Sequence, residues 1–183
     1  PRRGYFVFAG GGKSLILKEL AKANAFSVLC LSPKSLVKKW EKELADLGVE
    51  VTVLSPYWFK QQHKTLPYFD AIIIDEADQA YAGNNQTSKA LFAYLKKHDP
   101  PHIWLATATP YRSTPMNVYN LGRILGYMPM NYPEFREKFF FQQYFGAQPV
   151  WTPKMKHKDP KVLAQTQKDL HEYMSNYADI VRM

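Results

Sequence analysis

The sequence is poor in cysteine and contains no long apolar run. Its 183 residues include one cysteine, Cys30, which excludes an internal disulfide framework and a cysteine-rich zinc site. No apolar stretch approaches the roughly 20 residues that span a bilayer, and no charged-then-apolar leader of secretory type opens the sequence. We therefore expect a protein of the cytoplasm, nucleoid or nucleus that is not secreted and has no membrane partner.

Internal repeats and zinc-ligand spacing are also missing, and acidic residues are in the minority. The 5 histidines are scattered along the chain, without the close pairs that zinc sites use. The 24 lysines and arginines exceed the 16 aspartates and glutamates, giving a net charge of +8. This excess favours polyanionic partners without identifying one. An apolar fraction of 46% is typical of a globular domain with a core.

What the sequence does contain is an alternation of short apolar segments and amphipathic ones. Apolar or alternating segments predict strands at 5–9, 27–31, 49–54, 71–74 and 103–106, and apolar residues at helical spacing predict helices from about 14, over 34–47, over 87–97 and over 117–125. The alternation predicts an α/β fold in which helices cover both faces of a parallel sheet. Residues 146–161, rich in proline and lysine, are predicted to form a long loop.

The loop after the first predicted strand is rich in glycine and ends in a lysine and a serine: Gly10, Gly11, Gly12, Lys13 and Ser14. Glycines let backbone N–H groups approach phosphate oxygens closely. The lysine amine suits the outer phosphates of a nucleotide, and the serine hydroxyl suits Mg²⁺. The full phosphate-loop pattern would require glycine where the sequence has Val7, so a glycine-rich turn with a chance lysine is the alternative.

Two adjacent carboxylates follow the most apolar predicted strand. Asp75 and Glu76 come directly after Ala71–Ile74, and buried carboxylates are unfavourable unless they face a cation or solvent. Asp75 is suited to hold Mg²⁺ opposite Ser14, and Glu76 to orient or deprotonate an attacking water. An acidic helix start would explain the pair alone, but together with Lys13 it favours a nucleoside triphosphatase.

Several segments, in this order, resemble conserved motifs of superfamily 2 helicases and translocases. Residues 10–14, 72–78 and 105–110 resemble motifs I, II and III. Residues 31–44, Leu-Ser-Pro-Lys-Ser-Leu-Val-Lys-Lys-Trp-Glu-Lys-Glu-Leu, look like motif Ia of the Swi/Snf-type DNA translocases, and residues 108–121 look like the segment after their motif III. The resemblance covers nearly the whole chain, more loosely after about residue 126.

The resemblance implies a RecA-like P-loop NTPase lobe over residues 1–145, followed at 146–183 by the proline- and lysine-rich loop and a helical extension. ATP and Mg²⁺ would be its cofactors. A second RecA-like lobe, absent from this chain, would supply an arginine finger, so the isolated lobe would hydrolyse ATP weakly.

Other residues take roles from the same resemblance. In motif Ia, Ser32, Lys34 and Ser35 are the candidates to contact nucleic-acid phosphates. Thr107 and Thr109 are candidates to couple the two sites through hydrogen bonds to Asp75 or Glu76, although strand-end capping would use the same hydroxyls. Trp40 lies at core spacing and is predicted to be buried, whereas Lys38, Lys39 and Lys42 are predicted to form the solvated face of their helix.

The predicted function is that of an ATP-dependent helicase or translocase lobe acting on DNA. Residues 75–78 spell the DEAD signature, but the Pro-Thr-Arg-Glu-Leu motif of RNA helicases is missing and Ser-Pro-Lys stands in its place at 32–34. Duplex DNA is therefore favoured over RNA as the partner. Two alternatives stay open: a DEAD-box-like RNA helicase lobe, and a non-hydrolysing module that binds DNA or protein.

Overall fold

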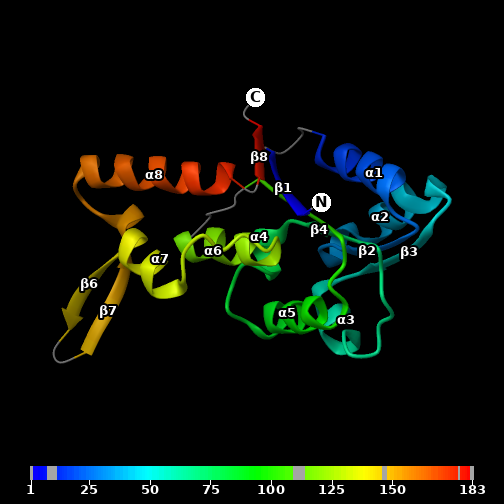
Figure 1. The fold of residues 1–183 in the computed structure, drawn as a ribbon, viewed down its shortest axis with the longest axis horizontal. Helices are drawn as coiled ribbons and strands as arrows, with labels where there is room; N and C mark the ends of the chain where they lie inside the picture. The colour runs from blue at the N-terminus through cyan, green and yellow to red at the C-terminus, as the bar shows by residue number, and fades with distance from the viewer. Residues whose placement is uncertain (1, 8–11, 109–113, 146–147, 177, 182–183) are drawn as a thin grey trace.

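The computed structural model describes residues 2–7, 12–108, 114–145, 148–176 and 178–181. Its centre is a sheet of six parallel strands in the order β3-β2-β4-β5-β1-β8 (Figure 1). The strands are β1 (Arg2–Val7), β2 (Ser27–Leu31), β3 (Glu50–Leu54), β4 (Ala71–Asp75), β5 (His102–Thr107) and β8 (Ala178–Val181). Apart from β8, each strand lies at or within a few residues of a predicted one.

Alternate residues of the central strands point to opposite faces of the sheet, as the two-residue period of a strand requires. On one face, Val28 and Cys30 of β2 and Ile73 of β4 pack with α1 (Lys13–Asn24) and α2 (Val37–Leu44). On the other, Leu29 and Ile72 share a core with residues of α3 (Pro56–Gln62), α4 (Ala77–Ala80), α5 (Gln86–His98) and α6 (Pro115–Ile124). The prediction of a parallel sheet with helices on both faces is confirmed.

The helix predicted over 34–47 is divided into three segments. A 3₁₀ turn, η1 (Lys34–Leu36), leads into α2, and a second one, η2 (Ala45–Leu47), ends at Gly48, whose φ of 70° is left-handed. Trp40 and Leu44 of α2 are buried against the sheet, while Lys38 and Lys42 are exposed. The predicted buried and solvated sides of this segment are therefore both present.

The region after α6 differs from the prediction. Instead of a long loop over 146–161, β7 (Gln148–Pro153) pairs antiparallel with β6 (Phe140–Phe145), and η3 (Lys154–Lys156) leads into α8 (Pro160–Ser175). A two-stranded ribbon consists of edges only, so prolines, which lack an N–H donor, are tolerated in it. The predicted boundary at 145/146 falls within this hairpin, α8 is the helical part that we predicted in 146–183, and β8 returns to pair with β1.

An aromatic cluster connects this region to the rest of the lobe. The rings of Phe135 and Phe139 in α7 (Tyr132–Phe139) lie 4.5 Å apart, and Tyr119 of α6 lies 4.8 Å from Phe135. Tyr173 of α8 packs edge-on against Phe135 at 5.4 Å. The hairpin projects at one end of the molecule, beyond α7 (Figure 1). Within the described part of the chain, no helix is long and apolar enough to cross a membrane.

Candidate active site

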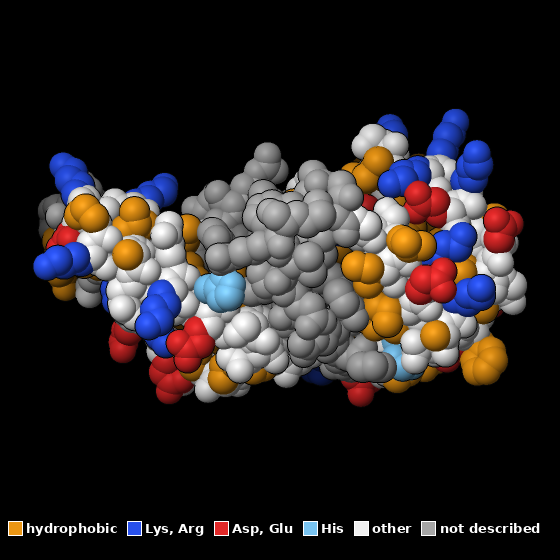
Figure 2. All heavy atoms as spheres, turned by 90° about the horizontal axis from the view of Figure 1, so that it is seen from above, with side chains coloured by type: hydrophobic (Ala, Val, Ile, Leu, Met, Phe, Trp, Pro, Cys, Tyr) orange, Lys and Arg blue, Asp and Glu red, His pale blue; other side chains and the backbone are white. Residues whose placement is uncertain are grey.

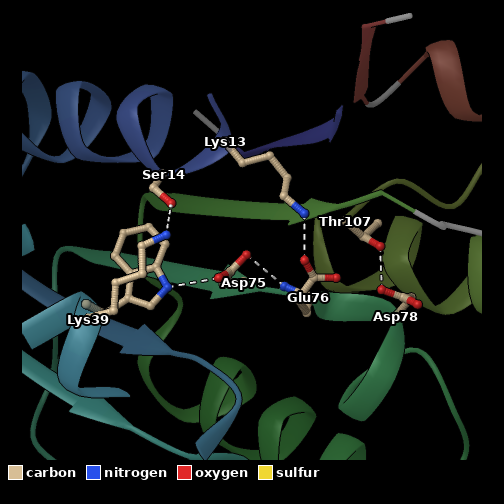
Figure 3. Close-up of polar contacts among 8 residues, drawn as sticks. Lys13, Ser14, Lys39, Asp75, Glu76, Asp78 and Thr107 are labelled. Carbon is tan, nitrogen blue, oxygen red and sulfur yellow. Dashed lines mark hydrogen bonds and ion pairs between the residues drawn. The ribbon is translucent and has the colours of Figure 1, made fainter. Parts of the chain in front are cut away.

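The start of α1 and the end of β4 meet at the carboxyl edge of the sheet. Lys13 is the first residue of α1, Asp75 is the last of β4, and Glu76 follows it. The Lys13 Nζ lies 2.6 Å from the Glu76 Oε1 (Figure 3). The two side chains are 13% and 23% exposed, so this ion pair is partly shielded from water. The structure thus brings together the amine and the carboxylates that we predicted would share one site.

The N-terminus of α1 has the features of an anion site. Gly12 precedes the helix with a φ of 78°, a left-handed conformation in which a side chain would be strained. No described side chain caps the helix at this end, so its first N–H groups have no such partner. N–H groups and the positive end of the helix dipole suit a phosphate. Gly10 and Gly11 lie outside the described residues.

Asp75 is a buried carboxylate held by two neutral donors. Its side chain is 6% exposed. The Trp40 Nε1–H donates to its Oδ2 at 2.9 Å, and the Glu76 backbone N–H donates to its Oδ1 at 3.0 Å. Within the described ranges no lysine, arginine or histidine pairs with it. Because a buried negative charge without a counter-charge is unfavourable, this carboxylate fits a site for a cation such as Mg²⁺.

Ser14 stands close to a second ammonium group. The Lys39 Nζ donates to the Ser14 Oγ at 3.3 Å and also lies 3.5 Å from the Glu43 Oε1. Lys39 was predicted to lie on the solvated face of its helix, and its side chain is 52% exposed. No cluster of three histidine, cysteine or acidic side chains occurs among the described residues. A magnesium ion here would therefore need water and phosphate oxygens besides Ser14 and Asp75.

Glu76 has an unusual backbone conformation. Its φ is 47°, a left-handed value that costs a non-glycine residue about 1–3 kcal/mol. The conformation turns the chain sharply from β4 into α4, and the side chain points towards Lys13 (Figure 3). Residues held in such strained conformations cluster at functional sites. The backbone geometry therefore keeps the Glu76 carboxylate at the carboxyl edge of the sheet and places its negative charge beside the Lys13 amine.

The partner of Thr107 differs from the prediction. Its hydroxyl donates to the Asp78 Oδ1, rather than to Asp75 or Glu76 as expected. Both residues are buried, Thr107 at the end of β5 and Asp78 in α4 (Figure 3). The sharp turn at Glu76 places Asp78 over the end of β5. The Thr107 hydroxyl therefore bonds to Asp78 and not to the predicted Asp75 or Glu76. Asp78 belongs to the DEAD signature, but nothing in its position along the chain indicated this contact. Thr109 lies outside the described residues.

The three residues predicted to contact nucleic acid lie just after β2 and differ in exposure. Lys34 and Ser35 are exposed in η1. Ser32 is fully buried, and its hydroxyl donates to the Pro33 carbonyl oxygen at 3.3 Å. The structure therefore presents two of these three side chains to solvent.

Two exposed aromatic residues at the same edge were not predicted as site residues. Tyr57 and Trp58 follow β3, the neighbour of β2, and are 59% and 54% exposed. Both come directly after a strand, at the edge where ligands of parallel sheets bind. On the face seen in Figure 2, lysines and arginines are mixed with aspartates and glutamates on both sides of the undescribed residues. Among the described residues of that face, the excess of positive charge is thus not gathered into one patch.

Comparison with known proteins shows similarity at the level of structure. No protein-family model matches the sequence, and no curated protein matches it significantly. The SWI2/SNF2 ATPase core of Sulfolobus solfataricus, solved in complex with dsDNA, superposes with a TM-score of 0.66 at 17% identity, covering 98% of this chain and 40% of that one. The Hef helicase domain of Pyrococcus furiosus gives a TM-score of 0.55 at 21% identity, covering 77% of this chain and 37% of that one.

The chain thus spans about two fifths of the length of either solved chain. At such identities the likeness concerns the fold, and both matched proteins carry it in a helicase or ATPase core. The parallel sheet with helices on both faces is common to this chain and to them. The chain has a RecA-like fold, similar to the folds of these two solved structures.

Proposed function

We propose that this chain is the first ATP-binding lobe of an ATP-dependent translocase or helicase that acts on duplex DNA in the cytoplasm, nucleoid or nucleus. The observation that carries the proposal is the meeting of Lys13 with Glu76 at the N-terminus of α1, next to the buried Asp75, which pairs with no lysine, arginine or histidine of the described ranges. This is the arrangement of charges that a magnesium-bound triphosphate requires. The motif order and the similarity to an ATPase core solved with dsDNA support the choice of partner.

In this proposal each residue has one task. The Lys13 amine leaves Glu76 and binds the outer phosphates, while backbone N–H groups of Gly10, Gly11 and Gly12 and of the first turn of α1 hold the others. Ser14 and Asp75 hold Mg²⁺, which when bound neutralises charge on the phosphate oxygens.

Glu76 then carries the chemical step. Freed from its ion pair with Lys13, its carboxylate orients a water for in-line attack on the γ-phosphorus and takes up the proton, while the bond from that phosphorus to the bridging oxygen breaks and ADP leaves. Thr107 and Thr109 lie on the segment that would link this site to the nucleic acid, the first through its bond to Asp78.

Binding of DNA would use the other side of the rim. Lys34 and Ser35 contact the phosphate backbone, which positions the lobe without reading sequence. Ser32 would join them only if its hydroxyl turned away from Pro33. An arginine finger from a second RecA-like lobe completes the site, and its absence costs about 10³–10⁵ in rate. We therefore expect the 183 residues alone to hydrolyse ATP poorly.

The test is ATP hydrolysis by the full natural chain with and without duplex DNA. Hydrolysis should depend on Mg²⁺, rise with DNA, and fall to background in Lys13→Ala and Glu76→Gln. Lys38→Ala is the matched control, because Lys38 is an exposed lysine of α2 away from the ion pair, and it should behave as wild type. DNA-stimulated turnover that survives in both site variants would refute the proposal. Stimulation by RNA but not DNA would instead indicate the RNA helicase alternative.

One observation favours a second candidate, a non-hydrolysing binding module. The glycine loop departs from the usual phosphate-loop pattern, since Val7 occupies the first glycine position, and a loop that opened at Ala9 instead would be too short for that pattern. Titration calorimetry separates the two functions. Binding of Mg·ATP that is lost in Lys13→Ala supports the enzyme, whereas absence of any nucleotide binding by the full natural chain supports the module.

A further inference from the structure

Helix α2 reaches the candidate active site through two consecutive residues. The Trp40 Nε1–H donates to Asp75, and the Lys39 Nζ donates to Ser14 (Figure 3). Asp75 and Ser14 are the two side chains assigned above to magnesium. A helix outside the glycine loop and the DEAD segment therefore contacts both candidate metal ligands.

The position of the Trp40 ring is fixed by packing. The residue is fully buried, in a cluster with Val28, Cys30 and Ile73 of the sheet. An indole N–H can only donate a hydrogen bond, and a buried one needs an acceptor. Here the acceptor is the Asp75 Oδ2 at 2.9 Å, a carboxylate, which makes the bond charge-assisted and stronger than a bond between neutral groups.

Two donors fix the rotation of the Asp75 carboxylate. Trp40 holds Oδ2, and the Glu76 N–H holds Oδ1 at 3.0 Å. Each oxygen keeps a further lone pair for a ligand. Outer groups that orient a metal ligand in this way commonly change metal affinity or activity by 10- to 100-fold when they are removed.

The residues proposed to contact DNA lie just before α2 in the chain. Lys34 and Ser35 lie in η1, which continues directly into α2. α2 also packs beside β3, and the Ser32 N–H donates to the Leu54 carbonyl oxygen at 3.1 Å. A displacement of η1 by a bound phosphate backbone would therefore be passed to Trp40 and from there to Asp75.

We propose that Trp40 is a positioning residue, which sets the orientation of the Asp75 carboxylate for magnesium and couples it, through α2, to DNA on Lys34 and Ser35. The inference rests on the proposed function and adds a residue that neither the glycine loop nor the DEAD segment contains. It also gives a physical role to a feature of α2 that its amphipathic pattern does not explain, the hydrogen bond from the buried Trp40 to an acid at the carboxyl edge of the sheet.

The test compares Trp40→Phe with Trp104→Phe in the full natural chain. Both tryptophans are buried in the same cluster, so both substitutions shrink the core similarly, but Trp104 stacks on His102 at 5.4 Å, and the hydrogen bonds of Asp75 within the described ranges come from Trp40 and Glu76. We expect Trp40→Phe to raise the Mg²⁺ concentration for half-maximal hydrolysis about tenfold or more and to reduce stimulation by DNA. Trp104→Phe should leave both quantities at wild-type values.

A second readout does not depend on activity. With ¹⁵N-labelled tryptophan indoles, the Trp40 resonance is the one that Trp40→Phe removes, and Trp104→Phe assigns Trp104. Adding Mg²⁺ with a non-hydrolysable ATP analogue should shift the Trp40 indole signal, as should Asp75→Asn, while the Trp104 signal stays in place. The response to Asp75→Asn verifies the hydrogen bond, and the response to the nucleotide tests the positioning role, because a purely structural tryptophan would not respond to the nucleotide.

The outcomes are separable from those of the proposed function. If the wild type hydrolyses ATP with Mg²⁺ and the two tryptophan variants are indistinguishable, or the Trp40 signal does not respond to the nucleotide, the positioning role is wrong and the proposed function stands. If the wild type neither binds nor hydrolyses Mg·ATP, both fail together.

Discussion

The two sides of the sheet's carboxyl edge are built differently. On the proposed nucleotide side, at the end of β4, Lys13, Asp75 and Glu76 are largely buried and joined to one another or to Trp40. On the proposed DNA side, after β2, Lys34 and Ser35 are exposed, and within the described ranges their side chains make no hydrogen bond or ion pair. Groups that act on a small substrate are held in place in advance, whereas those that meet a large partner stay free for it.

The largest effect should come from Lys13→Ala. The substitution removes the positive charge at the N-terminus of α1 and leaves Glu76 without its partner at 2.6 Å. We expect Mg·ATP binding, measured by calorimetry, to become undetectable, while DNA affinity in the absence of nucleotide is retained. Unchanged nucleotide affinity in a folded variant would mean that Lys13 does not bind the nucleotide phosphates.

Glu76→Gln should separate chemistry from binding. The amide keeps the size of the side chain and still accepts a hydrogen bond from Lys13, but it cannot take a proton from water. Turnover should fall by about 10²–10⁴, the usual contribution of a general base, with nucleotide affinity near that of the wild type. Glu41→Gln, an exposed carboxylate of α2, is the control in the same steady-state assay. Equal activity of both variants would remove Glu76 from the chemical step.

On the DNA side, Lys34→Ala should have a moderate effect of another kind. The loss of one phosphate contact should weaken binding to all duplex sequences about equally and reduce the slope of log affinity against log salt by about one. Nucleotide binding without DNA should not change. Lys22→Ala, an exposed lysine at the end of α1, serves as control in a fluorescence-anisotropy titration over salt. A change of the same size in this control would argue against a localised DNA site.

The smallest expected effect concerns Cys30, a fully buried residue of β2. Burial raises the pKa of its thiol well above the usual value, and the nearby charges of Asp75 and Glu43 raise it further. Because the thiolate is the reactive form, the native protein should resist thiol reagents at pH 8 and become labelled only on unfolding. Rapid labelling of the native protein, followed by absorbance, would show that this core is open to solvent.

Sequence patterns predicted the sheet well because its strands are short apolar runs. Ser27–Leu31 matches β2 residue for residue, and β4 exceeds its prediction by Asp75 alone. The hairpin β6–β7 was missed because Pro149 and Pro153 are typical of loops, and β8 because its four residues become a strand only by pairing with β1.

The sequence predicted which residues meet at the site but not the hydrogen bonds that hold them. The position of Lys13 opposite Asp75 and Glu76 follows from the rule that ligands bind where parallel strands end. The bond between Trp40 and Asp75, and that between Thr107 and Asp78, depend on how α2 and α4 sit on the sheet. Periodicity identified Trp40 as a core residue, but it does not reveal where a buried indole N–H points.

The central claim is that Lys13, Asp75 and Glu76 surround a single metal-bound triphosphate. It is tested most directly by a crystal structure of the full natural chain with Mn²⁺ and a non-hydrolysable ATP analogue, in which anomalous scattering locates the metal. The account predicts one strong peak between Ser14 and Asp75, with the outer phosphate against Lys13 and a water beside Glu76. A metal–nucleotide complex bound elsewhere, with the ion pair of Lys13 and Glu76 intact, would contradict it.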